Sequence, residues 1–196
     1  MPTIVPGSKP RLSAEELNAR IAPFGVDRSR YPLIVVGIRG YYKDTMGAPG
    51  VNDRGIYDDA IFIDSPSGTI AFNGNTDPTS YRKGHGTAGK TNGMASLMPG
   101  AWYVHKFAKH KGQYLALCQR AGSVTVMRDG DPPYQDIGDF GINIHGGGRN
   151  STSSAGCQTI HPDQWDSFIS TAVDQAKRYF GSEWQKTVIS YILVED

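Results

Sequence analysis

Short apolar segments separated by glycine and proline dominate this sequence, and they constrain its fold more than any other feature. The chain holds 24 glycines and 12 prolines among 196 residues, a high share of turn-forming residues for a helical protein. The segment 33–38 is short, apolar and β-branched, as in a buried strand. Similar patterns predict further strands at 56–63, 69–72, 102–107, 114–118, 124–127 and 187–194.

Two segments have helical patterns. Ser13 and Glu16 match a capping box, in which the serine hydroxyl accepts a free backbone N–H and the glutamate reaches back. This predicts a short helix directly after Ser13. Residues 162–180 carry apolar side chains at helical spacing and are followed by Gly181, which suits a helix end. We therefore expect a mostly β protein with a short N-terminal helix and a longer helix near the C-terminus.

The domain organisation is simple. Residues 1–12 are rich in proline and are expected to form an extended arm, and residues 13–196 are expected to form one domain. The glycine-rich stretch 73–100 has little periodicity and is expected to be a long loop, functional or merely exposed.

Charge and cysteine content exclude several classes of protein. With 20 basic and 19 acidic residues, the net charge of +1 argues against a nucleic-acid binder. Two cysteines cannot form a disulfide framework or a cysteine-only zinc site, and we expect no metal and no cofactor. From the sequence we expect neither a membrane-spanning segment nor a secretory signal. We expect synthesis in the cytoplasm without membrane insertion; the oligomeric state stays open.

One segment carries a pattern typical of catalysis. An alternating strand ends at His145, a loop of glycine and serine follows, and a turn of small residues holds Cys157. A cysteine paired with a histidine forms a thiolate near neutral pH, the nucleophile for acyl transfer. Gly156 leaves room for backbone N–H groups to face an oxyanion. The alternative is that Cys157 is a small buried residue and His145 a structural histidine.

The two cysteines have different surroundings. Cys157 lies among polar and small residues, which favours the catalytic interpretation. Cys118 lies in a strand-like apolar stretch and is predicted to pack in the core. A disulfide between the two is possible by count, but a reducing cytoplasm disfavours it.

The His-Gly pair and the Ser-x-Gly-Cys sequence resemble the L,D-transpeptidase catalytic domain, a cysteine-enzyme family of bacterial cell-wall metabolism. His145 and Gly146 match the first part of the family pattern, and Ser154, Gly156 and Cys157 match the second. The resemblance implies a β-sandwich-like fold, with Cys157 as nucleophile and His145 as its base. It also implies that Gly146, Ser154 and Gly156 shape the site and its oxyanion-binding groups.

This sequence departs from the family pattern at three places. Ala155 stands where the family has histidine, Gln158 where it has a hydrophobic residue, and Thr159 where it has arginine or asparagine. Because that arginine is suited to binding a substrate carboxylate, carboxylate binding must come from another residue here or differ from that of the family. The candidates are Arg39, Arg128 and Arg149.

The resemblance implies an enzyme that acts on peptidoglycan stem peptides through a thioester. Water as the acceptor makes it a peptidase, and an amine makes it a transpeptidase. The stand-alone chain resembles a single-domain endolysin, released to the wall by a holin-type factor. Alternatives are a non-catalytic wall- or glycan-binding module and a zinc-dependent wall peptidase, although no zinc-binding motif is present.

Several other polar residues are weaker candidates for the functional site. Asp58 and Asp59 are candidates for substrate binding, against the simpler interpretation of a carboxylate pair at a strand start. His105, His110 and His161 are alternative bases if His145 is structural.

Overall fold

The computed structural model describes residues 3–84 and 92–196. Within these ranges the chain is mostly β, with a short N-terminal helix and a longer helix near the C-terminus, as predicted. The helices are α1 (Ala14–Ile21) and α2 (Pro162–Phe180), with the 3₁₀ turns η1 (Ala22–Phe24) and η2 (Gly181–Glu183). The strands are β1 (Ile34–Arg39), β2 (Asp59–Ser65), β3 (Gly68–Asn75), β4 (Ala95–Leu97), β5 (Gly100–His110), β6 (Tyr114–Gln119), β7 (Val124–Arg128), β8 (Tyr134–Gly138), β9 (Ile144–Gly146), β10 (Gln158–Ile160) and β11 (Ile189–Glu195).

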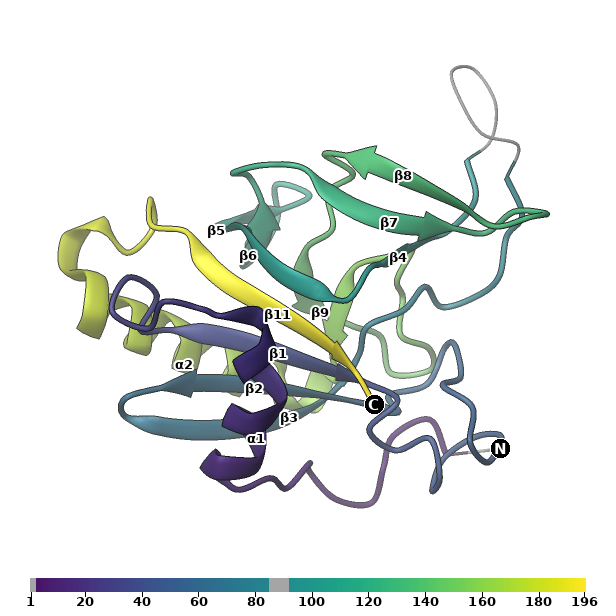
Figure 1. Ribbon diagram of the computed structural model, residues 1–196, viewed down its shortest axis with the longest axis horizontal. Coiled ribbons are helices and arrows are strands. Elements are labelled where there is room, and N and C mark those ends of the chain that lie inside the picture. The colour runs from purple at the N-terminus through teal and green to yellow at the C-terminus, as the bar shows by residue number, and fades with distance from the viewer. Residues whose placement is uncertain (1–2, 85–91) are drawn as a thin grey trace.

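The main sheet closes on itself (Figure 1). Eight of the described strands form a barrel in the order β1-β11-β5-β6-β9-β10-β3-β2, and β4, β7 and β8 form a separate small sheet. The sandwich-like arrangement that we expected is therefore replaced by a barrel. The physical reason is that β9 and β10, each 3 residues long, join the edges of β6 and β3 that two stacked sheets would leave unpaired.

Helix α1 covers the outside of the barrel (Figure 1). The Ser13 capping box forms as predicted, and Leu17 and Ile21 are buried against β1, β2 and β11. The preceding arm is held by hydrogen bonds, because the carbonyl of Ser8 accepts from Asn73 Nδ2 at 3.0 Å and that of Ile4 accepts from the Tyr57 backbone N–H at 2.7 Å. The described part of the arm thus packs on the barrel.

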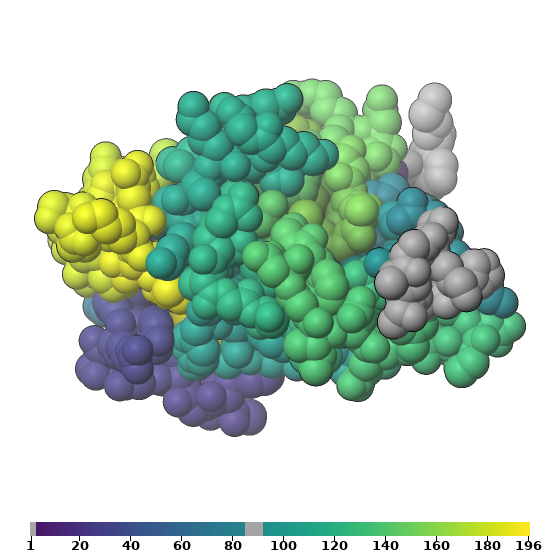
Figure 2. Space-filling model, turned by 90° about the horizontal axis from the view of Figure 1, so that it is seen from above, coloured from purple at the N-terminus to yellow at the C-terminus, as the bar shows by residue number. Residues whose placement is uncertain are grey.

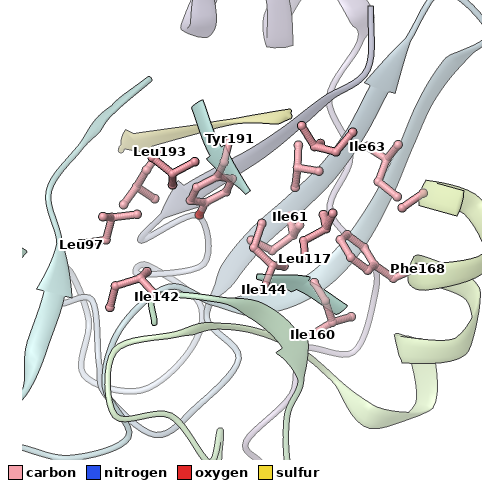
Figure 3. Close-up of a cluster of buried hydrophobic side chains, with 14 of the residues drawn as sticks. Ile61, Ile63, Leu97, Leu117, Ile142, Ile144, Ile160, Phe168, Tyr191 and Leu193 are labelled. Atoms are coloured by element: carbon pink, nitrogen blue, oxygen red, sulfur yellow. The ribbon is translucent and has the colours of Figure 1, made fainter. Parts of the chain in front are cut away.

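The interior core lies between the barrel, α2 and the small sheet (Figure 3). Along β2, Ile61 and Ile63 face this core while Phe62 faces α1, as the period of two in a strand requires. Helix α2 contributes Phe168, whose ring meets Phe72 edge to face with 5.2 Å between centroids. Further members of the core are Leu97, Leu117, Ile142, Ile144, Ile160, Tyr191 and Leu193.

The small sheet extends the core on the side away from α2. Ala95 and Leu97 of β4, and Val124 and Val126 of β7, belong to the same interior cluster. Seen from above, the segment of β5 and β6 lies between the C-terminal segment and the segment of β7 and β8 (Figure 2). The small sheet contacts the motif directly, because the Ala95 backbone N–H of β4 donates to the Ala155 carbonyl at 3.5 Å.

The predicted strands and helices are found within a few residues of their expected positions. The expected loop 73–100 contains the end of β3 and all of β4, while its residues 85–91 lie outside the described part. Strand β8 was missed, because it is an edge strand whose burial alternates only between intermediate and exposed. None of the described helices is long and apolar enough to cross a membrane.

The contact between α2 and the barrel gives a stability prediction. Phe168 is fully buried, so Phe168→Ala should lower the free energy of unfolding by about 3–5 kcal/mol, through lost burial and a residual cavity. Urea denaturation measures the difference. The control Ile137→Ala, at a side chain 71% exposed, should stay within about 0.5 kcal/mol of the parent. Equal effects of the two changes would contradict this packing.

Candidate active site

Two adjacent parallel strands bring the His-Gly and Gly-Cys sequences together. Strand β9 pairs with β10 so that His145 lies beside Thr159. Since side chains alternate along a strand, Ile144 and Ile160 point into the core while His145 and Thr159 point outward. Cys157 directly precedes β10 and is two positions before Thr159, so it lies on the same outward face as His145.

The neighbouring strands complete this face. His110, at the end of β5, pairs with Tyr114 at the start of β6. The His110 ring stacks on the His145 ring, with 4.1 Å between centroids and 22° between planes. The Tyr114 hydroxyl lies 3.5 Å from His145 Nδ1. His145 is therefore held between side chains of two strands and is 6% exposed.

Asn143 links the thiol to these histidines. Its backbone N–H donates to Cys157 Sγ at 3.4 Å. Its side-chain oxygen accepts from the Gln119 backbone at 2.9 Å, and its side-chain nitrogen lies 3.1 Å from His110 Nδ1. One residue thus contacts Cys157, β6 and the stacked imidazoles. Asn143 lies directly before β9, two positions before His145, and was not among the residues predicted to form the site.

The surroundings of Cys157 favour the neutral thiol. Its Sγ donates to the carbonyl of Gly141 at 3.3 Å. Burial raises the pKa of the thiol, and the Asn143 N–H and the charge of Lys111 offset this only in part. Burial therefore acts against the thiolate that the sequence pattern predicts near neutral pH.

The His145 imidazole is neutral as well. Burial lowers the pKa of His145 to about 4, against a smaller opposite effect of its bond to Gly146. Nδ1 lies 2.8 Å from the Gly146 carbonyl oxygen, so this nitrogen carries the proton and Nε2 is the free acceptor. In the described part of the chain no hydrogen bond joins His145 to Cys157, so they share a face without being in direct contact.

The turn before Cys157 is held by Ser154. Its hydroxyl donates to the Cys157 carbonyl at 2.6 Å and accepts from the Gly156 N–H at 2.9 Å. Because the Gly156 N–H is engaged, it does not face an oxyanion here. The Cys157 backbone N–H has no acceptor among the described residues and is the better candidate for that role.

Gly156 is required by its surroundings. Its φ is +146°, and a Cβ added there would lie 2.4 Å from the Ala95 carbonyl oxygen. The turn can therefore pack against β4 only with glycine at this position.

A cavity of about 400 Å³ opens beside the His-Gly pair. A Cβ at Gly146 would lie 3.0 Å from Trp165, so the glycine lets the indole pack against the strand next to His145. The lining residues are Tyr114, Gly146, Gly147, Pro162, Trp165 and Asp166.

A second cavity, of about 290 Å³, opens beside Cys157. Its walls come from the loops on either side of Cys157 and from the small sheet, and they include two arginines, Arg82 and Arg128. Arg82 was missed, because nothing near it in the sequence shows that its loop reaches the cysteine. The remaining lining residues are Asn92, Gly93, Ala95, Phe140, Gly141, Ile142, Ala155, Gly156 and Cys157.

The three arginines named from the sequence have different positions. Arg128 lines the cavity beside Cys157. Arg39 is buried, 3.2 Å from Asp77, and therefore has a structural role. Arg149 is 70% exposed and pairs with Asp163 at 2.6 Å, outside the residues that line either of these cavities.

The paired carboxylates at the start of β2 lie away from both cavities. Asp58 and Asp59 are fully buried, and burial first and their mutual proximity second raise the pKa of Asp58. Asp59 accepts from the Gly40 backbone at 2.6 Å and from the Thr76 hydroxyl at 2.7 Å. The contacts of this pair thus stabilise loops.

Cys118 is fully buried but belongs to neither hydrophobic cluster. It points outward from β6, with Sγ 3.5 Å from the Ala108 carbonyl oxygen. Both cysteines are free, and β9 lies between their strands, so about two strand spacings of 4.7–4.9 Å separate them. A disulfide would need the backbone to move.

The other histidines have structural positions. His105 is buried beside Tyr191, with Nε2 2.9 Å from the Ile142 carbonyl oxygen. His161 caps α2, accepting from the Asp163 N–H at 3.4 Å. Among residues 3–84 and 92–196, no group of three or more histidine, cysteine, aspartate or glutamate side chains is arranged to hold a metal ion.

Comparison of this chain with family models, with curated proteins and with solved structures gives no match. The resemblance to the L,D-transpeptidase pattern therefore rests on the motif residues of the sequence alone.

The tight turn gives a prediction with a matched control. Gly122 has a similar φ of +155°, but a Cβ there would meet its nearest neighbour at 3.4 Å, an ordinary contact. Both glycine-to-alanine changes carry the same backbone strain, so Gly156→Ala should destabilise by about 1–3 kcal/mol more than Gly122→Ala, through the added clash. Thermal and urea unfolding measure the difference. Equal losses would show that the turn can move away from β4.

The neutral thiol gives a pH prediction. Because burial raises the pKa of Cys157, its alkylation by iodoacetamide should be slow near neutral pH. The rate should still be rising above the ordinary thiol value of about 8.5. Mass spectrometry should find Cys157 labelled before Cys118, which is fully buried. The unfolded protein, in which both thiols react alike, is the control. An inflection well below 8.5 would indicate a preformed ion pair with His145.

Proposed function

We propose that this chain is a cysteine-dependent enzyme that cleaves or transfers peptide bonds of peptidoglycan stem peptides through a thioester, similar to L,D-transpeptidases. The observation that carries the proposal is the placement of Cys157 and His145 on one face of adjacent strands, with Cys157 in the wall of a cavity. A small buried cysteine with a purely structural role would not need a glycine-dependent turn at a cavity. The motif resemblance supplies the substrate class.

The proposed reaction begins with proton transfer during attack. Cys157 Sγ forms a bond to the carbonyl carbon of the scissile amide while its proton passes to His145 Nε2. The oxyanion accepts a hydrogen bond from the Cys157 N–H. The C–N bond then breaks, and the amine leaves with the proton from His145. Water or an amine then attacks the thioester carbonyl carbon and loses its proton to His145. The C–S bond breaks, and His145 returns that proton to Cys157 Sγ, which restores the thiol.

The resting geometry is compatible with this route. Both groups are neutral, as they must be for the histidine to take the thiol proton in the same step as attack. A movement that brings Nε2 to Sγ is required, and catalytic hydrogen bonds are often long before substrate binds. His110, stacked on His145 and bonded to Asn143, limits how the imidazole can turn.

The proposed function also implies where the enzyme acts. The enzyme acts on the cell wall after a separate factor has released it from the cytoplasm. If water is the acceptor, the enzyme cleaves the wall as an endolysin does. If an amine is the acceptor, the enzyme forms cross-links.

A second candidate function is glycan binding without catalysis. The cavity lined by Tyr114 and Trp165, with Asp166 at its edge, favours it, because aromatic faces and a carboxylate suit a sugar ring. In that case replacement of Cys157 would leave binding to peptidoglycan unchanged.

The test is digestion of purified peptidoglycan followed by mass spectrometry of the fragments. Cys157→Ala should abolish product formation, and His145→Gln should lower the rate by at least about 10²-fold, through loss of the base. Incorporation of ¹⁸O from labelled water distinguishes hydrolysis from transfer to an amine.

Matched controls use the other cysteine and another histidine. Cys118→Ala and His161→Gln should retain most of the activity, since neither side chain lines the cavity at Cys157. Digestion by Cys157→Ala at the parent rate would refute the cysteine mechanism. Loss of activity with a chelator and its recovery with zinc would favour the metallopeptidase alternative.

A further inference from the structure

The cavity beside Cys157 has walls of one charge sign. Among its described lining residues are two arginines, Arg82 and Arg128, and no aspartate or glutamate. The rest of the lining is glycine, apolar side chains, one asparagine and Cys157 itself. Arg128 is paired with Asp136, whose carboxylate does not line the cavity, and Arg82 forms no ion pair with a described residue. A cleft whose wall carries cations and no carboxylate of its own attracts an anionic group.

Arg128 is held rigidly in this wall. Its Nε donates to Asp136 at 2.6 Å, and Nη1 donates to the Gly93 carbonyl at 2.9 Å. The guanidinium lies over the Phe140 ring, 4.6 Å from its centroid. Nη2 has no hydrogen-bond partner within the described part of the chain. A guanidinium fixed in advance loses little entropy when a ligand binds to its free edge.

Arg82 completes the wall from another loop. Its backbone is held, because its N–H donates to Asp129 at 3.0 Å and its carbonyl accepts from Met94 at 3.1 Å. The residue is exposed, and its guanidinium forms no ion pair with any described residue. Asp129 pairs instead with Arg54 at 2.7 Å. The charge of Arg82 is therefore not neutralised by the protein around it.

Burial raises the pKa of the Cys157 thiol, and the Asn143 N–H and the charge of Lys111 lower it. Arg82 and Arg128 line the cavity that Cys157 also lines, so they are placed to interact with a group that enters it.

We propose that Arg82 and Arg128 form an anion subsite that binds a carboxylate of the acyl donor beside the thiol. The guanidinium groups bind the carboxylate by charge-assisted hydrogen bonds, which are strong and directional. The cavity of about 290 Å³ accommodates a group the size of one amino-acid residue. This inference deepens the proposed function, on which its assignment to an acyl donor rests; anion binding itself does not depend on turnover.

The experiment compares two thiol reagents of nearly the same size, of which one is an anion and the other is neutral. Iodoacetate carries a carboxylate and iodoacetamide a neutral amide, so the ratio of their alkylation rates at Cys157 reports anion binding without any turnover. Mass spectrometry measures each rate at Cys157, at one pH. The ratio of the iodoacetate rate to the iodoacetamide rate should be higher at Cys157 in the folded protein than in the unfolded protein. It should fall as salt is added.

The variant Arg82→Gln should lower the iodoacetate-to-iodoacetamide ratio about fivefold or more, with the iodoacetamide rate nearly unchanged. Arg128→Gln should do the same, and Arg128→Lys, which keeps the charge, should retain part of the preference. Arg149→Gln is the matched control, because this exposed arginine lies outside the cavity lining and should leave the ratio unchanged. If Arg128→Gln fails to fold, the exposed Arg82 decides the question alone.

A ratio in the folded protein equal to that in the unfolded protein, or one unaffected by Arg82→Gln, would overturn the subsite. Peptidoglycan digestion separates this result from the proposed function. An iodoacetate preference that depends on Arg82, together with full digestion by Cys157→Ala, would leave the anion subsite standing and refute the cysteine mechanism. No preference, together with an inactive Cys157→Ala variant, would refute the subsite and leave the mechanism standing.

Discussion

The pairing of β9 with β10 is the interaction on which the rest of the structure depends. Each strand has 3 residues, yet together they join β6 to β3 and so close the barrel. Their ladder is short, and the contacts of Asn143 extend it, because its carbonyl accepts from Gln158 at 2.8 Å and its side chain accepts from Gln119. Breaking this pair would expose two sheet edges and separate His145 from Cys157 in one step.

The same two strands serve the core and the site on opposite faces. Ile144 and Ile160 fill the interior, while His145 lies on the outward face with Cys157 before β10. Because the side-chain period is two, a shift of register by one residue would put the imidazole in the core and an isoleucine at the site. The packing of α2 against Ile160 therefore also maintains the geometry of the candidate catalytic residues.

The sequence predicts those parts of the structure that depend on residues close together along the chain, and it misses those that depend on residues far apart in sequence. The long strands and α2 follow from local periodicity, and the capping box at Ser13 follows from two side chains one turn apart. The alternating pattern that ends at His145 predicted a strand where β9 lies, but β10, with 3 residues, is too short to show a period. Closure of the barrel could therefore not be predicted from the pattern. Arg82 joins the site through a loop distant in sequence, and the burial of Asp58 depends on neighbours contributed by the chain around Asp53.

Electrostatics accounts for a site in which the thiol and the imidazole are neutral while the cavity wall carries two arginines. A standing thiolate would be costly here, since each unit by which burial raises a pKa corresponds to about 1.4 kcal/mol against ionisation. The site instead favours a neutral thiol and a neutral imidazole, which costs little desolvation. The wall of its cavity holds two arginines, the buried Arg128 and the exposed Arg82. A carboxylate arriving with the substrate would then meet cations already present in that wall. In the proposed mechanism, charge at the sulfur develops only while the proton moves to His145, so the protein never has to stabilise a permanent buried ion pair.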